Sequence, residues 1–150
     1  MYARSHWPGN ITIWAALIAW SLAQLIKMGR GLWLTRQLDF RLLFSTGGMP
    51  SAHTAMVSAL ATSVGLREGF RSSVFALALA FAAVVMFDAQ SVRRAAGQQA
   101  RLLNQIVEEL FKTHHLSETK LAELLGHTRV EVFVGMLMGV GVALLVHWLG

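Results

Sequence analysis

The stretch Gly47-Gly48-Met49-Pro50-Ser51-Ala52-His53-Thr54 joins a basic segment on one side to an apolar run on the other. The two glycines free the backbone for a turn, and the proline after them suits the first turn of a helix. Because the N–H groups at the start of a helix lack partners within it, they would point back at this loop and attract an anion such as phosphate. His53 falls within the predicted first turn, where its ring could give or take a proton. The stretch therefore predicts an anion-binding loop that carries a titratable group.

The composition around this stretch is that of a membrane protein. Of the 150 residues, 55% are hydrophobic and only 14% are charged, whereas a soluble domain carries about 25% charged residues. There is no cysteine, which excludes disulfides and thiolate zinc sites. The net charge of +5 comes from basic residues between apolar runs, as in loops that face anionic headgroups. We therefore expect membrane lipids, and no nucleic acid, as partners.

Four apolar runs predict an all-α bundle of four transmembrane helices in a single integral membrane domain, 1–150. The spans cover about residues 11–27, 51–66, 72–88 and 130–149. Each run holds about 15–18 residues, less than the roughly 20 that a spanning helix needs, so buried helices of a soluble α-domain are the alternative. A soluble chain of this size would keep almost no polar surface, and helices can extend into flanking loops to gain length. The last run also contains Gly135-x-x-x-Gly139, a motif for close helix packing.

The distribution of charge predicts how these helices are oriented. A signal peptide is the alternative for the first run, because Ser21-Leu22-Ala23 resembles a cleavage site. Arg4 alone precedes that run, however, and most of the basic residues follow it, which is the reverse of a signal peptide. The positive-inside rule places residues 27–50 and 88–129 in the cytoplasm and both termini outside the cell inner membrane. Since four short helices enclose little on their own, we expect a homo-oligomer.

The long polar segment 88–129 contains a predicted cytoplasmic amphipathic helix. From Val92 onward, apolar residues recur at helical spacing while Arg94 and Arg101 fall on another face. This helix would either continue the third run or lie on the membrane surface. Ser117 could cap a further short helix that stops at Gly126.

Ionisable residues gather at the predicted cytoplasmic ends of the spans, where they often mark function. These residues are His53, Asp88, Arg93, Arg94, His127 and Glu131. On a continuous helix His127 and Glu131 would share a face, and the carboxylate could fix the tautomer of the imidazole. Alternatively, Thr128-Arg129-Val130-Glu131 has the form of a capping box, which would leave His127 just outside the helix. The spacing leaves both interpretations open.

Two histidines on the same predicted side of the membrane suit phosphoryl transfer. That reaction needs cations or N–H groups around the phosphate oxygens, a nucleophile, and an acid for the leaving group. Histidine can serve as the nucleophile or the acid. The chain has no Walker loop, no H-E-x-x-H and no G-x-S-x-G motif, so the usual sites of nucleotide, zinc-protease and serine-hydrolase chemistry are not indicated.

Three motifs, in this order, resemble the divergent branch of the type-two phosphatidic acid phosphatase family, which is related to the vanadium-dependent haloperoxidases. The motifs are GGMPSAHTA (47–55), FDAQSVRRAAGQQA (87–100) and LGHTRVEVFVG (125–135). The resemblance implies a metal-independent phosphatase, without a cofactor, that acts on a lipid phosphate or a polyprenyl-(pyro)phosphate at the cytoplasmic face through a phosphohistidine.

The resemblance also assigns roles to individual residues. Pro50-Ser51-Ala52-His53 is similar to the family's P-S-G-H motif, so His53 would protonate the leaving group. His127 would attack phosphorus, oriented by Glu131 where the family has an aspartate. Lys27 would match the lysine of the family's first motif, although position 34 is Leu, without the family's Arg-Pro. The Ser-Arg that precedes the family's second histidine is replaced by Lys120 and Leu121.

The expected phosphate site is built around the 47–53 loop. Its catalytic residues are His53, His127 and Glu131, its phosphate-binding residues are Lys27, Gly48, Ser51, Arg93 and Arg94, and Asp88, Arg36 and Arg41 are further candidates; no metal site is expected. Two alternatives remain. A non-enzymatic phospholipid-binding or assembly protein would use the same basic surface. A metal-dependent membrane hydrolase would use His53, Asp88, His127 and Glu131 as ligands.

Overall fold

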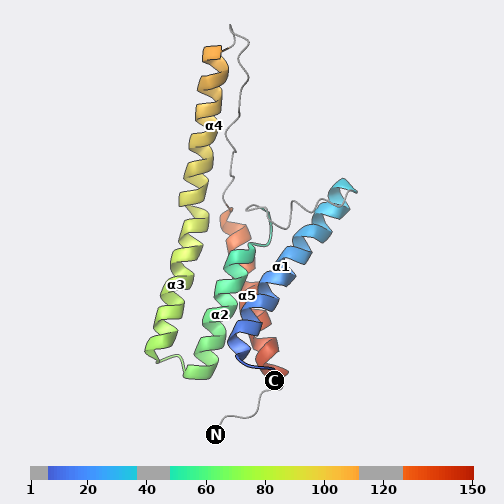
Figure 1. Ribbon diagram of the computed structural model, residues 1–150, viewed down its shortest axis with the longest axis vertical. Helices are drawn as coiled ribbons and strands as arrows, with labels where there is room; N and C mark the ends of the chain where they lie inside the picture. Colours follow the sequence, from blue (N-terminus) through green and yellow to red (C-terminus); the bar gives the residue numbers. More distant parts are fainter. Residues whose placement is uncertain (1–6, 37–47, 112–126) are drawn as a thin grey trace.

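The computed structural model describes residues 7–36, 48–111 and 127–150, and these residues form helices without any strand. The described helices are α1 (Ile11–Thr35), α2 (Ala52–Glu68), α3 (Ser73–Gln90), α4 (Val92–Phe111) and α5 (Arg129–Trp148). α1, α2, α3 and α5 form a bundle, and α4 continues α3 beyond it (Figure 1). The all-α fold class predicted from the sequence is confirmed.

The helix in the centre of the bundle is α2, which contacts α1, α3 and α5. Its packing surfaces are made of small residues. The core that α2 shares with α1 and α5 includes Ala19, Ala23, Ala55, Ala59 and Ala143. Because such side chains hold little bulk between two backbones, neighbouring helices approach closely.

The closest approach is between α2 and α5, at Gly135-x-x-x-Gly139. A Cβ atom at Gly135 would lie 2.6 Å from the Ser51 carbonyl oxygen, and one at Gly139 would lie even closer to the Ala55 carbonyl oxygen. The predicted packing motif therefore joins two helices of the same chain.

Polar residues set where the helices begin. The Asn10 side chain accepts a hydrogen bond from the Thr12 N–H at 2.9 Å at the start of α1. Ser72 does the same for the Phe75 N–H at 3.1 Å at the start of α3. These caps satisfy N–H groups that have no partner inside the helix.

By length and hydropathy, three helical stretches of the described chain could cross a bilayer: Ile11–Leu34, Ser73–Glu108 and Arg129–Trp148. The first span is predicted to end at about residue 27, and helix α1 continues beyond that point to Thr35. The segment after Lys27 holds no proline and regains apolar residues at 32–34, so nothing in it stops the helix. The second predicted span forms α2, which has 17 residues and is enclosed by its neighbours. Whether it crosses the bilayer stays a prediction.

The two ends of the described chain lie at the same end of the bundle, where the Gly150 backbone packs against the Trp7 ring. α2 and α5 begin at the opposite end (Figure 1). Near the chain ends, the Ser63 hydroxyl donates to Thr12 Oγ1 at 3.0 Å and lies 2.8 Å from His147 Nε2. This buried polar cluster links α1, α2 and α5. The assignment of the termini to the outside stays a prediction.

The junction between α3 and α4 is helical throughout. The Ser91 N–H donates to the Phe87 carbonyl and the Ala95 N–H donates to the Ser91 carbonyl, both at 2.9 Å. The amphipathic helix predicted from Val92 is confirmed as a continuation of the third run, and the surface-lying alternative does not describe this structure. The short helix predicted between Ser117 and Gly126 lies outside the described residues.

Candidate functional site

Two backbone hydrogen bonds bring three distant segments together at the end of the bundle where α2 and α5 begin. The Ser51 N–H donates to the Glu131 carbonyl, and the His127 N–H donates to the Ala89 carbonyl, each at 3.1 Å. The first two motifs contribute one residue each to this junction, Ser51 and Ala89, and the third contributes both His127 and Glu131. The candidate site is built around it.

The central contact of the site is between His127 and Glu131. His127 Nδ1 lies 3.2 Å from Glu131 Oε2, and only 2% of the histidine is exposed. The same carboxylate oxygen accepts the Thr128 N–H at 2.9 Å, while the Glu131 N–H donates to Thr128 Oγ1 at 3.3 Å. The capping-box interpretation is confirmed, with His127 just outside α5, and the same Glu131 carboxylate also contacts the imidazole.

This contact determines which nitrogen of His127 can act as a nucleophile. A carboxylate beside Nδ1 favours the proton on that nitrogen, so the lone pair of the neutral ring resides on Nε2. The Nε2 atom is itself buried. The arrangement suits attack on an electrophile once a substrate reaches that side of the ring.

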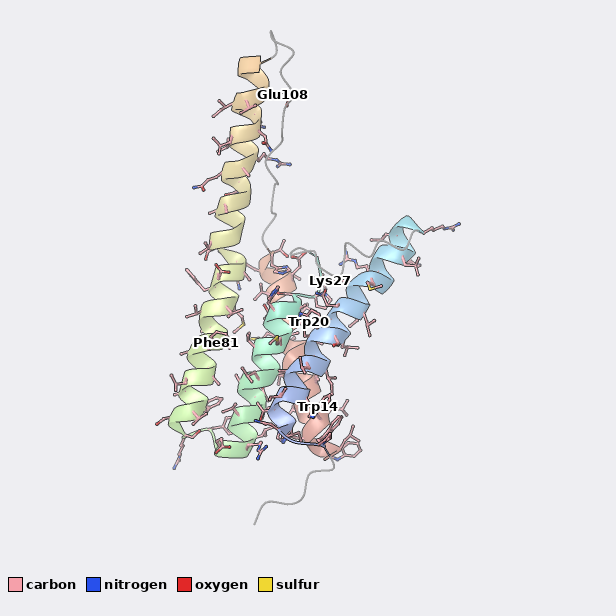
Figure 2. The ribbon with its side chains drawn as sticks, viewed as in Figure 1. Trp14, Trp20, Lys27, Phe81 and Glu108 are labelled. Carbon is pink, nitrogen blue, oxygen red and sulfur yellow. The ribbon has the colours of Figure 1, made fainter. Side chains whose placement is uncertain are left out.

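Lys27 brings a cation to the same region from α1. Lys27 is only 7% exposed, and Gln24, one turn earlier on α1, is only 5% exposed. Figure 2 shows Lys27 on α1 beside the start of α2. Burial opposes the positive charge of Lys27, and the negative charge of the Glu131 carboxylate partly offsets this effect.

The start of α2 contributes the remaining described groups. Ser51 is fully buried, and its hydroxyl oxygen accepts the Thr54 hydroxyl at 3.0 Å and the Thr54 N–H at 3.4 Å. Since the Ser51 N–H is also bonded to Glu131, Ser51 here links helices. His53 is exposed in the first turn of α2, and Gly48, with a φ of +91°, is exposed just before it.

The predicted arginines are not all brought to this junction. Asp88 is half-buried immediately before Ala89, at the edge of the site. Arg93 and Arg94 occupy the first turn of α4, and their side chains lie outside the described part of the structure, as does Arg41 altogether. Arg36 is exposed at the end of α1. It lines a depression whose other residues, Gly29, Leu32 and Trp33, also belong to α1.

The set of ligands considered for a metal does not assemble in the described residues. Across residues 7–36, 48–111 and 127–150, no group of three or more His, Cys, Asp or Glu side chains could hold a metal ion. The metal-dependent alternative, which needs His53, Asp88, His127 and Glu131 as one set, has no geometric support there.

Three contributors were not identified from the sequence. Thr54 supports the Ser51 cap, Gln24 shares the buried face of Lys27, and Ala89 offers only its carbonyl. Gln24 could have been found, because it lies three residues before Lys27 in an otherwise apolar run. A backbone acceptor such as Ala89 leaves no mark in the sequence.

The comparison with known families agrees with the resemblance carried by the three motifs. The description "Divergent PAP2 family" belongs to the family whose model matches residues 9–142. The chain belongs to the divergent PAP2 family. The match includes every described member of the site and confirms the family suggested by the motifs.

Among curated proteins, this divergent PAP2 chain is similar to "Uncharacterized membrane protein YuiD" of Bacillus subtilis (strain 168). The two are 42% identical over 142 residues, which cover 87% of this chain and 90% of the relative. No solved structure matches the chain. Together with the apolar helices, the comparisons show a membrane-embedded protein of a phosphatase-related family.

Proposed function

We propose that the chain is a membrane phosphatase for lipid or polyprenyl phosphates that acts through a phosphohistidine on His127. The observation that carries this proposal is the 3.2 Å contact between His127 Nδ1 and Glu131 Oε2. It presents Nε2 as the nucleophile and stabilises the ring as positive charge develops during attack.

The phosphate would bind between Lys27 and the start of α2. Lys27 would supply a positive charge, and the N-terminus of a helix attracts anions through its dipole and its N–H groups. α2 begins beside Glu131, whose negative charge attracts the Lys27 ammonium group. A phosphate placed there would be within the same junction as His127.

The position of Lys27 along α1 favours a substrate held in the membrane. Beyond Lys27, α1 continues through Leu32, Trp33 and Leu34, which are 41%, 81% and 64% exposed. These apolar side chains suit the hydrocarbon or its interface. Lys27 therefore lies below the apolar end of its helix, at a level that a lipid headgroup reaches more readily than a soluble phosphate ester.

The reaction balances with two histidines and one water. His127 Nε2 attacks phosphorus, the phosphorus–oxygen bond to the lipid breaks, and protonated His53 gives its proton to the leaving oxygen. Water then attacks the phosphohistidine, its proton returns to His53, and the phosphorus–nitrogen bond breaks to release phosphate. We place this chemistry at the cytoplasmic face of the inner membrane.

The test is phosphate release by the purified full chain in vesicles that contain phosphatidic acid, a polyprenyl phosphate or a polyprenyl diphosphate. His127→Ala and His53→Ala should each lower turnover by at least about 100-fold. His147→Gln is the matched control, because His147 lies on the same helix as Glu131 but at the other end of the bundle. Wild-type turnover in both alanine variants would refute the scheme.

The burial of His127 favours a second candidate, a phospholipid-binding or assembly protein without catalysis. With 2% of His127 exposed, substrate must displace whatever covers the ring. A binding protein would retain anionic lipids in the His53→Ala variant, lose them on replacement of Arg93 and Arg94, and release no phosphate from any substrate in the panel.

A further inference from the structure

α4 carries an apolar stripe that the rest of the described chain leaves uncovered. Val92, Leu103 and Ile106 are 57%, 49% and 51% exposed. Among the described helices, α4 contacts only α3, and Figure 1 shows it rising beyond the bundle.

The stripe continues a pattern that already packs helices inside the bundle. On α3, Ala78, Ala82 and Val85 lie against Val57 and Ala61 of α2. The same alternation of three- and four-residue steps continues along α4 at positions 92, 96, 99, 103, 106 and 110, which are apolar except for Gln99. Such a heptad repeat forms the contact line of a coiled coil. α2 covers the part on α3, and the part on α4 needs another helix.

Lipid cannot cover the whole stripe. The helical stretch Ser73–Glu108 has 36 residues, which at about 1.5 Å per residue is roughly 54 Å, against a hydrocarbon core of about 30 Å. α4 is also collinear with α3 (Figure 1). Much of it therefore projects into water, where exposed apolar side chains favour burial against a partner.

We propose that α4 of a second copy of this chain covers the stripe, in a parallel and in-register pair. Copies inserted in one membrane with one orientation project α4 in the same direction and to the same height. The repeat places Arg94, Arg101 and Glu108 opposite the contact line, where they do not oppose their counterparts.

The paired region is limited to α4. Below Ser91 the corresponding face of α3 is occupied by α2, so the two α3 helices separate there and the pair forms above the bundle. The proposal is independent of the proposed phosphatase activity.

The absence of cysteine in the chain allows a direct cross-linking test. Leu103→Cys and Ile106→Cys place a thiol on the contact line, while Arg101→Cys and Glu108→Cys are matched controls on the opposite face of the same helix. Each full-length variant is oxidised in its native membrane and its disulfide-linked dimer is measured by non-reducing electrophoresis. We expect at least a fivefold larger dimer fraction for the two contact-line variants.

Each cross-linking result either supports or overturns the proposed pair. Because copies in one membrane share one orientation, preferential dimers at both 103 and 106 indicate a parallel, in-register pair and support the proposal. Equal cross-linking on both faces, preference for the controls, or no dimer at any position would overturn it. An unchanged thermal midpoint in all four variants, measured in detergent, verifies that each is folded.

Discussion

Replacing Gly135 with alanine should separate α5 from α2 and disrupt the candidate site. The added Cβ would lie 2.6 Å from the Ser51 carbonyl oxygen, whereas a carbon and a carbonyl oxygen rarely approach closer than about 3.3 Å. Relief of this clash needs a shift of about 0.7 Å between the two backbones. The hydrogen bond from the Ser51 N–H to the Glu131 carbonyl, now 3.1 Å long, would lengthen to about 3.8 Å and be lost.

The expected cost combines overpacking with the lost hydrogen bond, roughly 1–3 kcal/mol in the free energy of unfolding. Gly141→Ala is the matched control, because a Cβ at Gly141 meets nothing within 4 Å and alanine favours a helix by about 0.5–1 kcal/mol. Unfolding of both variants in detergent, followed by circular dichroism, measures the difference. If Gly135→Ala is as stable as Gly141→Ala, the close approach of α2 and α5 does not exist in the protein.

Three further substitutions test other contacts. Glu131→Gln should keep the capping bond from Thr128 and change the free energy of unfolding by less than about 0.5 kcal/mol, yet lower phosphate release. Glu131→Ala should lower phosphate release and also lose about 1 kcal/mol of stability from the cap. Equal phosphate release in wild type and both variants would contradict the role of the carboxylate. Lys27→Met should weaken binding of a lipid phosphate about 10- to 100-fold, as measured by titration with labelled lipid, and unchanged affinity would remove Lys27 from the site. Ser63→Ala should lower the free energy of unfolding by about 1 kcal/mol, because two interhelical hydrogen bonds are lost. Phosphate release should not change, and its loss would show that the two ends of the bundle are coupled.

Most of the architecture follows from the pattern of apolar residues. The helical class and the runs that become α3 and α5 are evident because these segments are apolar on all sides. The end of α1 was missed because Lys27 and Arg30 look like the start of a cytoplasmic loop. In the structure Lys27 is buried within electrostatic reach of Glu131, and an interaction between residues so distant in the chain has no local signal.

The sequence indicated which residues belong to the candidate site better than it indicated the contacts between them. The four-residue spacing of His127 and Glu131 suggested either an oriented imidazole or a capping box, and the sequence offered no reason for both. The structure has the capping box, and the same carboxylate oxygen also contacts the imidazole of His127 outside the helix. Ser51, predicted to bind phosphate, links α2 to α5 in the structure, because the close contact with Gly135 brings the Ser51 N–H to a backbone acceptor.

Because Glu131 Oε2 both completes the first turn of α5 and contacts His127, winding of that turn and alignment of the ring are a single event. A chain whose fifth helix has frayed by one turn loses its oriented nucleophile even if every side chain remains intact. Chemical reactivity at His127 would then report on local helix order, and any ligand that tightens this turn would raise the share of molecules ready to react.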